Sequence, residues 1–147
     1  MNQTIRILNK HFHIHILLLI ALLLSAMFKL IYFEGLLTES VIAERYAIAA
    51  TLIVIPLALK LFNDQIKKAV DNYTESAAIN RYKNAFFRRL YLLSFVAFGN
   101  IVLYAVSQNM NFMWLTVIIL LTFIFCRASA DELQNMMPHD ENVSGDD

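Results

Sequence analysis

The sequence predicts an all-α integral membrane protein, built as a bundle of four transmembrane helices. Of its 147 residues, 59% are apolar and only 16% are charged, whereas soluble domains are nearer half apolar and a quarter charged. Three glycines and two prolines favour long helices over loops. The apolar segments do not alternate with a period of two, which argues against the strands of an outer-membrane barrel.

Four segments are apolar enough to be membrane spans. About 20 residues, at roughly 1.5 Å each, cross a hydrocarbon core of about 30 Å. Arg45 and Lys60 lie near the two ends of the second span. We expect their aliphatic side-chain stems to lie in lipid while their charged groups reach water at the membrane surfaces. The apolar run after Arg6 and Lys10 resembles a signal peptide, but its poor cleavage site favours an uncleaved anchor. The predicted spans are residues 14–33, 41–62, 90–106 and 111–127, in a transmembrane domain of residues 14–130.

The basic residues are distributed unequally between the two sides of this bundle. All of them except Lys29 and Arg45 belong to the side that holds the N-terminus, the connection between the second and third spans, and the C-terminus. By the positive-inside rule, both termini are cytoplasmic. We therefore expect a cytoplasmic N-terminal segment of residues 1–13, an acidic cytoplasmic tail of residues 131–147, and a location in the inner membrane of a bacterium.

The connection between the second and third spans, residues 63–89, is the largest segment expected in water. Its apolar residues recur at helical spacing, which predicts that the two spans continue as a cytoplasmic helical hairpin with a break at residues 72–74. Basic residues outnumber acidic ones here, and such a cluster attracts anionic lipid headgroups. This cluster of basic residues is expected to act as a topology signal. The alternative is that it is a docking patch for an acidic partner. The patch consists of Lys67, Lys68, Arg81, Lys83, Arg88 and Arg89.

Polar residues inside the predicted spans are few, and each either joins helices or lines a transport pathway. Asn100 is expected to hydrogen-bond a neighbouring helix, with Gly99 allowing a close approach. Pro56 is expected to kink the second span and free the carbonyl of Leu52. Lys29 is expected within the last turns of the first span. The full set of candidates is Asn100, Pro56, Thr51, Lys29 and Glu44.

The sequence contains no motif of a common enzyme class, such as a glycine-rich phosphate loop, GxSxG or HExxH. The single cysteine, Cys126, excludes a disulfide and a CxxC pair. His11 and His15 share one helix face and are the candidates for a metal site, but interfacial imidazoles explain the pattern equally well. We expect no enzymatic activity, no cofactor and, with zero formal net charge, no nucleic-acid partner.

Two functional hypotheses follow. The first is a non-enzymatic membrane component: an accessory, assembly or partner-binding subunit, which includes an immunity-type protein that intercepts another membrane protein. The uniform predicted helices of this chain and its charged cytoplasmic segments favour this hypothesis. The alternative is a small homo-oligomeric transporter or channel, with Asn100, Thr51, Pro56 and Glu44 along the route. The lack of Asp and Glu in mid-membrane weighs against a proton-coupled carrier.

Overall fold

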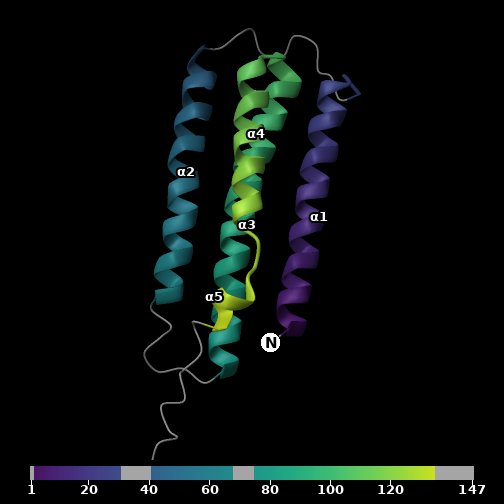
Figure 1. The fold of residues 1–147 in the computed structure, drawn as a ribbon. Helices are drawn as coiled ribbons and strands as arrows, with labels where there is room; N and C mark the ends of the chain where they lie inside the picture. Colours follow the sequence, from purple (N-terminus) through teal and green to yellow (C-terminus); the bar gives the residue numbers. More distant parts are fainter. Residues whose placement is uncertain (1, 31–40, 68–74, 135–147) are drawn as a thin grey trace, which may run out of the picture.

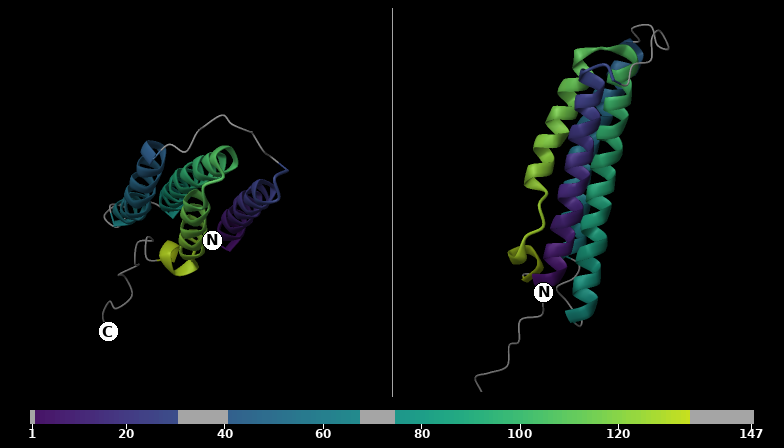
Figure 2. Two further views of the ribbon diagram at one scale, coloured as in Figure 1. Left: turned by 90° about the horizontal axis from the view of Figure 1, so that it is seen from above. Right: turned by 90° about the vertical axis from the view of Figure 1, so that its right-hand side faces the viewer.

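The computed structural model describes residues 2–30, 41–67 and 75–134. These ranges form helices and contain no strand, which confirms the predicted all-α fold class. The four longer helices run side by side, with α3 and α4 between α1 and α2 (Figure 1, Figure 2). The helices are α1 (Asn2–Met27), α2 (Val41–Lys67), α3 (Glu75–Ser107), α4 (Met110–Phe125) and the short α5 (Ala130–Gln134).

Three of these helices are long and apolar enough to cross a membrane: α1 from Gln3 to Met27, all of α2, and α3 from Ser76 to Ser107. The fourth, α4, is apolar but has 16 residues, which corresponds to about 24 Å. This is shorter than a hydrocarbon core of about 30 Å. The structure therefore supports a membrane-embedded helical bundle with three such helices. The fourth span is predicted at residues 111–127, but α4 ends two residues earlier, at Phe125.

Helix α1 ends at Met27, although the first span is predicted to continue to residue 33. The Leu30 N–H donates to the carbonyl of Ser25 at 2.9 Å. The Lys29 N–H donates to the carbonyl of Ala26 at 3.2 Å, and Lys29 has a φ of 54°. This left-handed cap satisfies the last carbonyls of α1. Lys29 thus lies in a turn beyond the helix, and not inside the first span as predicted.

Helix α3 is the centre of the bundle, because it packs against α1, α2, α4 and α5. Several of the residues that it buries are alanines, and α2 likewise buries small residues toward it. Small side chains let helix backbones approach closely, which is the main source of packing between helices in lipid. A cluster of larger rings packs where α1, α2 and α3 lie beside the last turn of α4. The buried aromatic rings there are Phe12, Phe62, Tyr82, Phe86 and Phe123.

We predict that Lys29→Gly stabilises the protein, because glycine adopts a positive φ without the steric cost that a Cβ imposes. The free energy of unfolding should rise by about 1 kcal/mol relative to Lys29→Ala, which removes the same side chain but keeps the Cβ. Unfolding by SDS in mixed micelles, followed by circular dichroism, measures the difference. Equal stabilities of the two variants would show that the cap is not strained.

Candidate functional site

A groove of about 800 Å³ runs along α3, flanked by α1 and α2. Its wall is largely apolar, and several of the side chains that line it are exposed, Phe95 to 76% and Leu18 to 58%. Helix α4 contributes no lining residue, so the groove lies on the side of α3 that faces away from α4. The apolar lining residues include Leu18, Leu19, Ala58, Leu61, Leu92, Phe95 and Phe98.

Polar side chains in the wall come from all three helices. Helix α1 contributes His15, α2 contributes Gln65, and α3 contributes Arg88 and Arg89. The hydroxyl of Ser94 also belongs to the wall, is itself buried, and has no hydrogen-bond partner within the described part of the chain. No Asp or Glu lines the groove within these described ranges. The groove therefore combines an apolar wall with a local excess of positive charge.

Arg89 is buried, with 5% of its surface exposed. Its guanidinium carbon lies 3.6 Å from the centre of the Phe62 ring, and its Nη2 donates to the carbonyl of Cys126 at 2.7 Å. That carbonyl belongs to the residue that ends α4, where helix carbonyls lack partners and the helix dipole favours a cation. Arg89 is thus a structural cap of α4. It does not belong to an exposed docking patch, which corrects the interpretation from sequence.

Three further hydrogen bonds hold the chain that follows α4. The hydroxyl of Tyr82 donates to Oε2 of Glu132 at 3.0 Å and accepts from the N–H of Ser129 at 3.2 Å. The amide of Asn9 donates to the carbonyl of Ala128 at 3.4 Å. Helices α1 and α3 therefore both anchor the segment that leads into α5. The sequence carries no signal for these contacts, because the residues are far apart along the chain.

Asn100 and Thr51 are both buried, and Nδ2 of Asn100 donates to Oγ1 of Thr51 at 3.0 Å. This bond joins α3 to α2 near the middle of their contact. Gly99 is not needed for close approach, because a Cβ built on it meets no atom within 4 Å. Helix α2 continues through Pro56, whose side chain is exposed on its surface. The structure therefore brings Asn100 and Thr51 together and leaves Pro56 outside this contact.

Glu44 lies in the first turn of α2, at the end of the bundle where α3 turns into α4. Its carboxylate accepts hydrogen bonds from the side-chain amides of Asn109, at 3.2 Å, and Asn111. Asn109 is also the N-cap of α4, since its side chain accepts from the backbone N–H of Asn111 at 2.9 Å. The three residues tie the start of α2 to the turn between α3 and α4. Glu44 is therefore occupied by contacts between helix ends.

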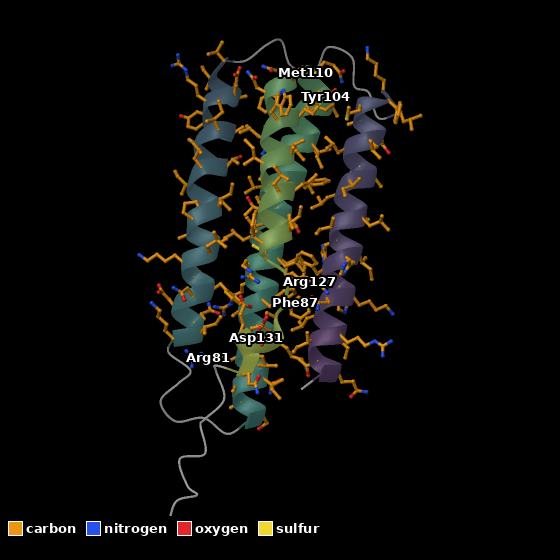
Figure 3. The ribbon with its side chains drawn as sticks, viewed as in Figure 1. Arg81, Phe87, Tyr104, Met110, Arg127 and Asp131 are labelled. Atoms are coloured by element: carbon orange, nitrogen blue, oxygen red, sulfur yellow. The ribbon has the colours of Figure 1, made fainter. Side chains whose placement is uncertain are left out.

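Of the remaining cations of the predicted docking patch, Lys67, Arg81 and Lys83 lie near the end of the bundle where α2 ends and α3 begins, and Arg88 lies farther along α3. Lys67 and Arg88 are exposed, and Arg81 and Lys83 are partly exposed. Arg81 lies at the same end of the bundle as Arg127 and Asp131 (Figure 3). Lys68 of the patch, the break predicted at residues 72–74 and the tail beyond residue 134 lie outside the described residues.

His11 and His15, the candidates for a metal site, each pack against an aromatic ring of α3. The ring centroids of His11 and Phe87 are 5.8 Å apart, and those of His15 and Tyr91 are 5.4 Å apart, both in edge-to-face geometry. Within residues 2–30, 41–67 and 75–134, no three His, Cys, Asp or Glu side chains are grouped so that they could hold a metal ion. These histidines therefore contribute to the contact between α1 and α3.

Comparison with protein-family models, curated proteins and solved structures found no match to this chain.

We predict that the Asn100–Thr51 hydrogen bond stabilises the contact between α2 and α3. Asn100→Leu and Thr51→Val should each lower the free energy of unfolding, and the double variant should lose less than the sum. The coupling energy should be about 0.6–2 kcal/mol, the range of hydrogen bonds between membrane helices. SDS unfolding of the four proteins measures it. Strict additivity of the two substitutions would contradict the bond.

We predict that Arg89→Gln lowers the free energy of unfolding by about 2 kcal/mol, because it removes a charged hydrogen bond to a helix terminus and the contact with Phe62. Arg89→Lys should recover only part of the loss, since an ammonium lacks the planar fork of arginine. The matched control is the exposed neighbour Arg88→Gln, which should change stability by less than about 0.5 kcal/mol in lipid-free detergent. Equal effects at both positions would refute the capping role.

Proposed function

We propose that all four long helices cross the inner membrane of a bacterium, with both termini in the cytoplasm. The polar contacts of Glu44 lie beside Ser107, and the exposed Arg88 lies 19 residues before Ser107 on α3, which corresponds to about 28 Å along the helix. This distance matches the thickness of a hydrocarbon core. The cations gather at the Arg88 end, and the positive-inside rule then makes that end cytoplasmic.

We propose that the protein is a non-enzymatic component that binds another membrane protein, as an accessory or assembly subunit or in an immunity-type role. The observation that carries this proposal is that the polar side chains inside the bundle form hydrogen bonds between its helices. Asn100 bonds Thr51, and Arg89 bonds the end of α4, so these groups stabilise the bundle and do not face a route through it. The charged side chains that extend from the bundle lie mainly at its proposed cytoplasmic end.

A partner at this end would meet a surface formed by the last turn of α2 and the first turns of α3. Lys67 is exposed there, and Lys83 lies on α3 with part of its surface open. A cluster of cations recognises acidic segments of a partner and steers its approach. We propose that the partner carries acidic residues in the part that meets this surface.

We predict that a stoichiometric partner copurifies with the full chain from native membranes in mild detergent. Replacing four cations of the patch with glutamine should weaken this association severalfold, because electrostatic recognition depends on them. The patch variant carries Gln at Lys67, Lys68, Arg81 and Lys83. A control variant with the same loss of charge at the same end carries Gln at Arg6, Lys10, Lys60 and Arg127.

Mass spectrometry identifies the copurified protein, and a native mass gives the stoichiometry. The partner should remain with the control variant and decrease with the patch variant. A homo-oligomer with no second protein would contradict the proposal and favour the transporter or channel alternative. Equal retention by both variants would show that the patch does not contact the partner.

A further inference from the structure

We propose that the groove along α3 holds one anionic phospholipid, whose phosphate is bound by Arg88 and whose acyl chain lies against Phe95 and Phe98. This inference rests on the membrane embedding of the bundle and not on the proposed partner. The lipid occupies the face flanked by α1 and α2, whereas the docking patch lies at the helix ends. Charge, depth and shape each support a lipid at this position.

Charge complementarity is the first argument. Arg88 is an exposed cation in the wall of the groove, and the described lining residues include no carboxylate that would compete for it. A guanidinium binds phosphate through two parallel hydrogen bonds. The side-chain amide of Gln65 lines the groove from α2 and can donate to the same headgroup. Arg89 takes no part, because its guanidinium already caps α4.

Depth is the second argument. Phe98 lies ten residues beyond Arg88 on α3, which corresponds to about 15 Å along the helix. One leaflet of a hydrocarbon core about 30 Å thick has the same depth. With Arg88 at the level of the headgroups, the apolar wall between Tyr91 and Phe98 therefore follows the path of an acyl chain down to the middle of the bilayer.

Shape is the third argument. The groove has a volume of about 800 Å³ and is bounded on both sides by helices, so a chain within it contacts protein on three sides. Lipid on an open helix face has protein on one side only. The site thus offers contacts to the phosphate and to one acyl chain.

Native mass spectrometry of the full-length protein in mild detergent tests the headgroup contact. The probes are phosphatidylglycerol and phosphatidylcholine with identical acyl chains. We expect one tightly held phosphatidylglycerol and weaker binding of phosphatidylcholine, which has no net charge. Arg88→Gln should weaken the binding of phosphatidylglycerol about fivefold. Lys83→Gln, which removes a cation from the same helix outside the groove, should leave it unchanged.

A second pair of variants tests the chain contact. Leu61 lines the groove and is 45% exposed, whereas Leu57, on the same helix and 42% exposed, does not line it. Leu61→Trp should fill the groove and remove the bound lipid, and Leu57→Trp should retain it. Circular dichroism checks that both variants are folded.

Equal lipid binding by Arg88→Gln and Lys83→Gln, or by the two tryptophan variants, would overturn the proposal. So would a native mass in which a second copy of the chain replaces the lipid. If the lipid binds as expected but no partner protein copurifies, only the proposed function is contradicted. The two proposals can therefore fail separately.

Discussion

The capping of α4 by Arg89 is the interaction on which the arrangement of the bundle depends. Its guanidinium lies over the ring of Phe62 from α2 and donates to the carbonyl of Cys126, so one side chain of α3 joins three helices. A buried cation is costly unless hydrogen bonds and nearby negative potential compensate it. The ring face and the negative end of the α4 dipole both supply that potential. Helix α4 must therefore end at this depth and beside this face of α3.

The other polar contacts hold the same helices at different heights. Asn100 and Thr51 fix α2 against α3 in the interior, and Glu44 ties the start of α2 to the turn before α4. Apolar packing in lipid specifies little about the register of two helices, because most of their surface is chemically alike. Three polar contacts at three heights remove that freedom. The large groove on the opposite face of α3 is left open because α1 and α2 each pack on α3 and not across it.

Composition and segment length were enough to predict an all-α membrane protein, since helices alone satisfy a backbone in lipid over such runs. The end of α1 could not be predicted, because a lysine with a positive φ carries no sequence signal. Asn100 could be singled out as a polar residue in an apolar run, but its partner depends on how α2 and α3 align. Arg88 and Arg89 look alike in sequence, and only the position of the α4 terminus buries one and exposes the other.

The shortness of α4 has a consequence for the surrounding lipid. Helix α4 supplies only about 24 Å of apolar length, and Arg89 holds its end at the level of Arg88 on α3. With α4 crossing the membrane as proposed, both ends of this helix lie at the headgroup levels that Glu44 and Arg88 mark, so a hydrocarbon core about 30 Å thick must thin around the protein. Such thinning attracts neighbours whose own spans are short. The protein would then select its neighbours in the membrane partly by their hydrophobic length, before any side chain touches them.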